Sequence, residues 1–158
     1  MNEQAIQSIA ETVVSKISPK DITLDLAQSV AQKVREKAEK MGVKAVVAIS
    51  NRAACPVLVE SMDDAYIASY DIAVQKAFTV VSLKMSTATL KPLAQPGGSL
   101  YGIQFTNGGK IVIFGGGEPL KNREGQIVGG IGVSGGTEAQ DTALAAYGKE
   151  IFEKGQYL

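Results

Sequence analysis

The stretch QIVGGIGVSGGTEAQD occupies residues 126–141 and joins a predicted strand to a predicted helix. Its first part, residues 126–134, mixes glycine with Ile and Val, which is typical of a strand that another backbone approaches closely. Its last part contains TEAQ at 137–140, a capping-box pattern that starts a helix. We therefore predict that a buried strand leads directly into a final helix at 138–153.

Within this stretch, residues 130–135 read GIGVSG and match the pattern G-x-G-x-x-G of dinucleotide-binding folds. Such a site also needs a second strand that ends in an acidic residue about twenty residues later. The sequence after residue 135 is occupied by one predicted helix, so we favour glycines that permit tight packing and shape a pocket wall. Anion binding at the N-terminus of that helix stays open, because free N–H groups there favour negative charge.

The glycines are concentrated around the same stretch. Fourteen of the seventeen lie between residues 97 and 136, which predicts turns, bulges and exposed backbone. We predict three strands here, at 99–105, 110–114 and 126–134, with a hairpin turn at 106–109. A low-complexity linker is the alternative, but the interleaved Ile and Val residues argue against it.

The first half of the chain is predicted to be mostly helical. Helical spacing of apolar residues marks the segments 2–17, 23–41 and 66–84, and a short helix is expected at 87–94. Two strands rich in Val and Ile are predicted at 43–50 and 56–62. Their connection, residues 51–55, is too short for a crossover, so these strands must be antiparallel.

This order of elements predicts the fold class α+β, with a five-stranded, mainly antiparallel sheet flanked by helices. We divide the chain into an amphipathic N-terminal helix at residues 1–18 and a single domain at 19–158. The N-terminal helix is expected either to pack in an interface or to act as a targeting segment.

Composition excludes several classes of function. Sixteen basic and sixteen acidic residues cancel, so no basic field favours nucleic acid. Histidine is absent, which removes catalytic triads and metal sites that depend on it. One cysteine and no apolar run of about 18 residues indicate a reducing compartment and no membrane span. With no signal-peptide pattern at the N-terminus, we expect a cytoplasmic protein.

Lys76 is the most conspicuous charged residue, because it lies in an otherwise apolar helix. Its stem could cover apolar surface while its amine reaches water. Alternatively, it could face a ligand carboxylate. Asp71 lies on the previous helical turn, and Asp141 lies in the first turn of the last helix. The run FGGGEP at 114–119 is either a turn that needs positive φ or a surface where a flat ligand meets bare backbone.

Several of these segments, in order, resemble the GlcG/HbpS-like (haem-degrading-domain) family. The matching blocks are SYDIAVQKAFT at 69–79, PGGSLYG at 96–102, FGGGEP at 114–119, VGGIGVSGG at 128–136 and QD at 140–141. Together they cover about residues 22–152. Several ordered blocks are more specific than any one of them alone.

The resemblance implies a profilin-like arrangement of helices around an antiparallel sheet, assembled into homo-oligomers. It also implies haem or another tetrapyrrole, such as a cobalamin, as a ligand in some members, and a relation to the C-terminal domain of PduO-type cobalamin adenosyltransferases. The sequence departs from the pattern at the turn 51–55 and in having no histidine. Cys55, Met62 and the tyrosines are then the candidate haem ligands.

We therefore predict a non-catalytic small-ligand binding protein, accessory to a cofactor-dependent pathway. The predicted ligand site consists of Lys76, Gly115, Gly116, Gly117, Glu118, Ser134, Gly135 and Asp141. One alternative is an enzyme that uses Lys76, Asp71 or Tyr101 for proton transfer, and another is a structural assembly subunit. Residues 1–17 resemble the peptides that direct cargo into bacterial microcompartments, which would place the protein in such a compartment.

Overall fold

The computed structural model describes residues 2–9 and 18–156. The elements are, in order, α2 (Leu24–Lys40), β1 (Val46–Asn51), β2 (Pro56–Ser61), α3 (Ile67–Ser82), α4 (Thr87–Leu93), two 3₁₀ turns (Ile103–Phe105 and Asn107–Gly109), β3 (Gly117–Lys121), β4 (Ile127–Ser134) and α5 (Glu138–Glu153). The strands form one antiparallel sheet in the order β2-β1-β4-β3. The α+β class is confirmed, with four strands in the described residues rather than five.

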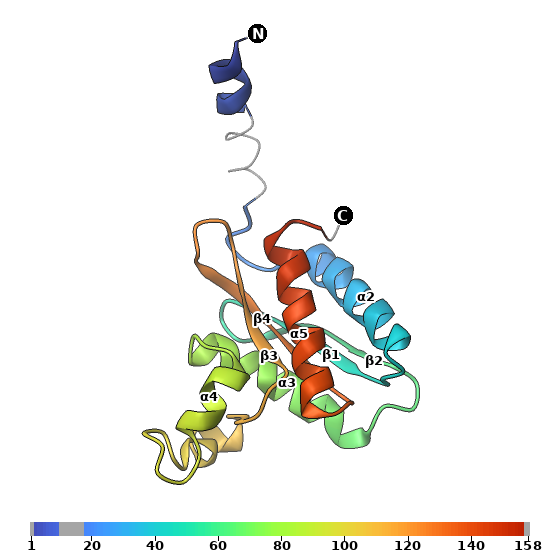
Figure 1. Cartoon of the computed structure of the whole chain (residues 1–158), viewed down its shortest axis with the longest axis vertical. Coiled ribbons are helices and arrows are strands. Elements are labelled where there is room, and N and C mark those ends of the chain that lie inside the picture. Colours follow the sequence, from blue (N-terminus) through green and yellow to red (C-terminus); the bar gives the residue numbers. More distant parts are fainter. Residues whose placement is uncertain (1, 10–17, 157–158) are drawn as a thin grey trace.

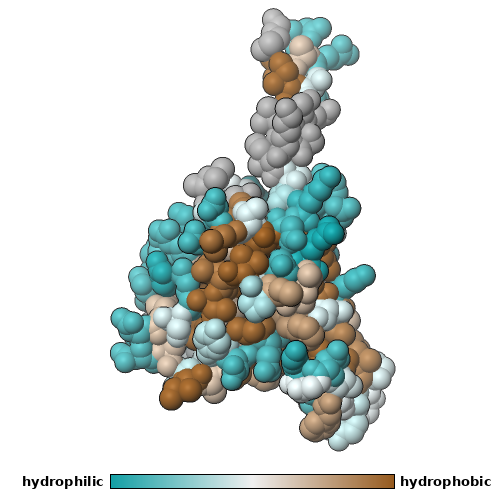
Figure 2. All heavy atoms as spheres, turned by 180° about the vertical axis from the view of Figure 1, so that it is seen from behind, coloured by the Kyte–Doolittle hydropathy of each residue, from teal (hydrophilic) through white to brown (hydrophobic). Residues whose placement is uncertain are grey.

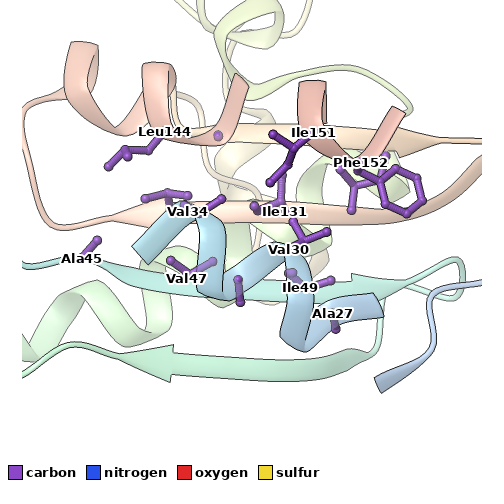
Figure 3. Close-up of a cluster of buried hydrophobic side chains, with 14 of the residues drawn as sticks. Ala27, Val30, Val34, Ala45, Val47, Ile49, Ile131, Leu144, Ile151 and Phe152 are labelled. Carbon is purple, nitrogen blue, oxygen red and sulfur yellow. The ribbon is translucent and has the colours of Figure 1, made fainter. Parts of the chain in front are cut away.

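The two faces of the sheet are covered by different helices (Figure 1). α2 and α5 lie on one face, where their aliphatic side chains meet Val47, Ile49 and Ile131 of the sheet (Figure 3). α3 lies on the opposite face, against Val46 and Ala48 of β1. The helices therefore form a layer on each side of the sheet. The finer likeness to profilin stays a prediction.

Several predicted elements are confirmed. The segments at 23–41, 66–84 and 138–153 are helices, and β1 pairs with β2 in an antiparallel hairpin. The capping box of α5 is present, because the Thr137 hydroxyl accepts the Gln140 N–H at 3.2 Å and the Gln140 side chain accepts the Thr137 N–H at 2.9 Å. Local periodicity and capping chemistry were sufficient for these elements.

The strands predicted at 99–105 and 110–114, and the hairpin turn at 106–109, are wrong. This segment contains residues with positive φ, which interrupt an extended strand: Gly102, Asn107, Gly108 and Gly109. Val112 donates its N–H to the Thr79 hydroxyl at 3.0 Å, so that N–H bonds to a side chain of α3 instead of a neighbouring strand. Ile111 and Val112 are buried, which explains the strand-like composition.

The third strand of the sheet is instead β3, which overlaps the run at 114–119, predicted to be either a turn or a surface for a flat ligand. Pro119 lies within β3, and a proline is tolerated there because β3 is an edge strand of the sheet. The hairpin between β3 and β4 turns at 122–126, where Asn122 and Gln126 exchange backbone and side-chain hydrogen bonds. The strand predicted at 126–134 is confirmed as β4.

The N-terminal helix predicted at 2–17 lies partly outside the described residues. Residues 3–9 are helical, and 10–17 are not described. Ile6 and Ile9 are exposed, at 51% and 54%. The helical segment 3–9 lies away from the sheet (Figure 1). Among the described helices, none is both long enough and apolar enough to cross a membrane.

Close contact between α3 and β4 explains the glycine pattern at 130–135. A side chain on Gly132 would collide with the carbonyl oxygen of Ala73 and would lie 2.7 Å from the backbone nitrogen of Ala77, both in α3. Gly130 also packs against α3, because a Cβ atom on Gly130 would lie 2.8 Å from the Ala77 carbonyl oxygen. The glycine pattern therefore permits the close contact between α3 and β4, which agrees with the prediction that these glycines serve tight packing.

Candidate functional site

A pocket of about 310 Å³ lies where the start of α3, the end of β4 and the start of α5 meet. We call it the α3–α5 pocket. Tyr66, Ser69, Phe114, Ser134 and Asp141 are among its lining residues, together with the glycines 135 and 136. Its size lies within the range of about 300–1,000 Å³ that is typical of small-molecule sites.

Lys76 lies behind the pocket wall and is completely buried. Its ammonium donates to the Val133 carbonyl oxygen at 2.7 Å and to Asp141 Oδ2 at 3.3 Å. The Phe114 ring, which lines the pocket, lies over the same ammonium, 4.9 Å from the ring centroid. The expectation that the amine reaches water is wrong, because acceptors from β4 and α5 surround it.

Burial dominates the electrostatics of this pair. Loss of hydration lowers the pKa of the Lys76 ammonium, and the neighbouring Asp141 carboxylate opposes that shift. Burial likewise raises the pKa of Asp141, against the Gly136 N–H and the Lys76 charge. The Gly136 N–H donates to Asp141 Oδ1 at 2.9 Å. Lys76 and Asp141 therefore form a buried ion pair that joins α3, β4 and α5.

Gly116 allows this ion pair to form. It adopts φ +111, and a side chain there would lie 2.5 Å from Lys76 Nζ and 2.9 Å from Asp141 Cβ. Beside it, the Gly115 N–H donates to Glu138 Oε1 at 2.9 Å. Lys91 holds the other oxygen of Glu138 at 2.6 Å. The run at 114–116 is therefore tied to the first turn of α5.

Two serines mark the inner wall of the pocket. Both are buried, and the Ser134 hydroxyl lies 3.1 Å from the Ser69 hydroxyl. Ser69 was not among the predicted site residues, although its spacing from Lys76, seven residues along α3, places both on one helix face. That spacing is the signal that could have identified it.

The structure thus brings together Lys76, Gly115, Gly116, Ser134, Gly135 and Asp141 of the predicted site. Gly117 and Glu118 lie on β3 outside the pocket lining. The Gly117 N–H donates to the Thr87 hydroxyl at 2.9 Å. Glu118 pairs with Lys149 of α5 at 3.3 Å. Glu118 therefore contacts the helix layer that contains α5.

The remaining candidates lie elsewhere. Cys55 is exposed in the β1–β2 turn, and the Met62 sulfur accepts the Ala45 N–H at 3.3 Å. Asp71 and Tyr101 are exposed and do not line the pocket. Within the described part of the chain, no group of three or more Cys, Asp or Glu side chains is arranged to hold a metal ion.

A second pocket of about 460 Å³ adjoins the first. Tyr66, Gly135 and Gly136 line both pockets, and Lys44 lines the second. Because the two share these residues, they lie side by side along the Gly135–Gly136 backbone, and we call the pair of pockets the groove. Tyr66 is not among the predicted site residues, because the sequence alone does not show whether a tyrosine faces a pocket or only the core.

Comparison with known proteins places these features in a family. A family model described as "Haem degrading protein HbpS-like" matches residues 22–150. An uncharacterized 15.0 kDa protein from the dhaT-dhaS intergenic region of Citrobacter freundii is 41% identical over 133 residues, which cover 84% of this chain and 93% of that protein.

Solved structures agree with this match. The crystal structure of Klebsiella pneumoniae protein ORFY superposes with a TM-score of 0.80 and 43% identity, covering 83% of this chain and 90% of that chain. The structure of a PduOC:heme complex superposes with a TM-score of 0.78 and 33% identity, covering 82% of this chain and 94% of that chain. The fold is therefore shared with a relative whose structure contains haem.

Proposed function

The chain belongs to the HbpS-like family, and from this premise we propose that it is a non-catalytic binding protein for a tetrapyrrole, with haem as the first candidate. The observation that carries the proposal is the groove formed by the two pockets. It combines exposed aromatic rings, bare backbone and a lysine. The PduOC:heme structure of a relative at 33% identity supports haem as the ligand to test first.

The residues of the groove fit a flat macrocycle. Tyr66 and Phe114 are 74% and 39% exposed, so their rings are accessible for contact with a planar ligand. The backbone of Gly135 and Gly136 lines both pockets, with the Gln140 side chain packed beside Gly136. Lys44 could pair with a carboxylate at the edge of the ligand. Cys55 and Met62 do not line either pocket, so a different donor must hold the iron.

Haemin titration followed by absorbance in the Soret region tests the proposal. The unmodified protein is expected to give a saturable, stoichiometric change. Ala68 is exposed and lines the α3–α5 pocket, so Ala68→Trp should fill the pocket and abolish this change. Ile67→Trp is the matched control, because Ile67 is 96% exposed and lies outside the pocket lining.

A parallel titration with cobalamin identifies the class of macrocycle. Saturable binding of cobalamin that Ala68→Trp abolishes would assign the groove to a corrin instead of haem. Absence of saturable binding with both ligands would contradict the proposal. Binding that survives in Ala68→Trp would contradict the assignment to the groove.

Assembly is part of the same proposal. Figure 2 shows apolar side chains gathered on the face of the molecule opposite to α2 and α5. We propose that this face is covered in a homo-oligomer. A monomer in light scattering would contradict this proposal.

We also propose that residues 1–17 are a microcompartment-targeting segment. Unchanged localisation after deletion of residues 1–18 would contradict that role.

An enzyme of small-molecule chemistry is the second candidate. The lowered pKa of Lys76 favours it, since such lysines serve as bases and nucleophiles. Asp71 is exposed whereas Lys76 is buried, so the carboxylate beside the amine is that of Asp141. Because Lys76 has no exposed surface, a substrate could reach it only after Phe114 moved. For this reason we place binding before catalysis.

A further inference from the structure

The identity of the iron ligand can be approached by elimination. The chain contains no histidine. The Cys55 thiol lies in the exposed β1–β2 turn, and the Met62 sulfur accepts a backbone hydrogen bond. Of the side chains that line the groove, Tyr66 has a phenol, and tyrosinate is an established axial ligand of haem iron.

The position of Tyr66 in the fold also needs an explanation. It is the N-cap residue of α3, with φ −60 and ψ 137, and it makes no side-chain cap hydrogen bond. Serine, threonine, aspartate and asparagine are preferred at this position because they satisfy a free N–H. α2, α4 and α5 all have such a cap, from Thr23, Ser86 and Thr137. The exposed ring of Tyr66 therefore does not stabilise the helix that it starts.

Its surroundings point to a ligand. Tyr66 stands where the two pockets meet, together with Gly135 and Gly136. A flat ligand bound against these shared residues would contact the Tyr66 side chain. Lys44 lines the second pocket, where it could pair with a carboxylate at the rim of the ligand.

We propose that the Tyr66 phenolate is the axial ligand of a ferric haem that lies across Gly135 and Gly136, with Lys44 paired with a propionate. The inference rests on the proposed function. On binding, the phenol oxygen forms a bond with the ferric iron, and its proton is released to solvent, so no oxidant or reductant is needed. Such a site differs in chemistry from a histidine-ligated one.

Tyr66→Phe tests this assignment, because it removes the oxygen and keeps the ring. The matched control is Tyr70→Phe, one turn further along α3, since Tyr70 is 51% exposed and lines neither pocket. The unmodified protein and Tyr70→Phe should show the charge-transfer absorption and resonance Raman bands of ferric tyrosinate. Tyr66→Phe should lose them and bind haemin at least about tenfold more weakly, since even outer-shell partners of a metal ligand contribute about 10–100-fold.

Iron-free protoporphyrin IX separates ligation from stacking. Tyr66→Phe should bind this probe as well as the unmodified protein does, because the ring is retained and no metal bond is involved. Equal weakening with haemin and the iron-free ligand would overturn the assignment. Unchanged tyrosinate bands in Tyr66→Phe would also overturn it and leave the proposed function standing. No saturable haemin binding in the unmodified protein would contradict both.

Discussion

The two faces of the sheet are packed by different means, although β4 contributes to both. On one face, Ile131 and Val133 of β4 belong to an aliphatic core with α2 and α5 (Figure 3). On the other face, Gly130 and Gly132 meet the backbone of α3. From this second face, Lys76 of α3 also reaches Asp141 of α5 and forms a buried ion pair.

This difference shows what each face contributes. Aliphatic packing stabilises the fold by burying apolar area, and it tolerates substitutions that change the shape of a side chain but conserve its volume. The glycine contacts bury little side-chain area, but they bring α3 close enough for Lys76 to reach Val133 and Asp141. The close approach of α3 to β4 also places the N-terminal ends of α3 and α5 around the pocket. We infer that the α2/α5 face serves mainly stability and the α3 face serves mainly the position of the site.

The largest expected effect comes from Asp141→Asn. It leaves the Lys76 charge buried without its partner, which is expected to cost about 3–5 kcal/mol of unfolding free energy. Glu118→Gln is the matched control, because the Glu118–Lys149 pair has the same N–O distance of 3.3 Å, with side chains 14% and 33% exposed. Glu118→Gln should lower the unfolding free energy by about 1 kcal/mol or less. Urea unfolding of both variants provides the comparison.

The same variant makes a prediction about pH. Without the Asp141 carboxylate, burial still lowers the pKa of Lys76 and only the weaker effect of Glu138 opposes it, so this pKa falls further below its ordinary value of 10.5. Between that lowered pKa and 10.5 the unfolded state binds more protons, so stability rises with pH in this window. The loss caused by Asp141→Asn should therefore shrink as the pH rises from the pKa of Lys76 in the variant to its pKa in the unmodified protein. A loss that is constant over this range would argue against a charged, buried Lys76.

The next effect is that of Gly132→Ala, which places a methyl group against the backbone of α3. Because backbone cannot move aside as a side-chain end can, we expect a loss of about 2–3 kcal/mol. Gly148→Ala in α5 is the counterpart on the aliphatic face, where the new methyl would meet side-chain atoms of Ile131 and Val34 at 2.6 and 2.9 Å. Helix propensity favours alanine there by about 1 kcal/mol, so the net change should be small.

Denaturant unfolding of the two glycine variants measures the difference directly. Haemin titration of the same samples adds a second readout, since Gly132→Ala should also displace the pocket wall whereas Gly148→Ala should leave binding unchanged. Equal losses of stability would mean that the two faces accommodate extra volume alike. The distinction drawn between them would then be wrong.

The sequence predicted the parts of the fold that depend on local patterns. Apolar spacing identified α2, α3 and α5, and the short 51–55 connection established the β1–β2 hairpin. β3 was missed because Pro119 and its glycine neighbours are typical of a turn. Whether a proline can occupy a strand depends on the strand being at an edge, and that is a property of the assembled sheet.

The site was predicted in part for the same reason. Glycine runs and Lys76 stood out in the sequence, but helical spacing identifies only neighbours on the same helix, which led to Asp71. The actual partner, Asp141, is 65 residues away and comes close only after β4 pairs with β1 and α5 packs on the sheet. Helical periodicity could not identify Tyr66 as a site residue, because its role depends on two pockets that meet only in the folded chain.

The smallest expected effect concerns Tyr66 itself and links stability to function. Tyr66→Ser introduces a hydroxyl that can accept a free N–H of the first turn of α3, as Thr137 does for α5. We expect a gain of about 0.5–1 kcal/mol in unfolding free energy. Haemin binding should be lost at the same time, because the phenol is absent. Thermal unfolding and haemin titration of one preparation measure both. A variant that is no more stable than the unmodified protein would show that the tyrosine imposes no cost on the helix. The position of Tyr66 would then give no reason to infer a bound ligand, whatever the titration gave.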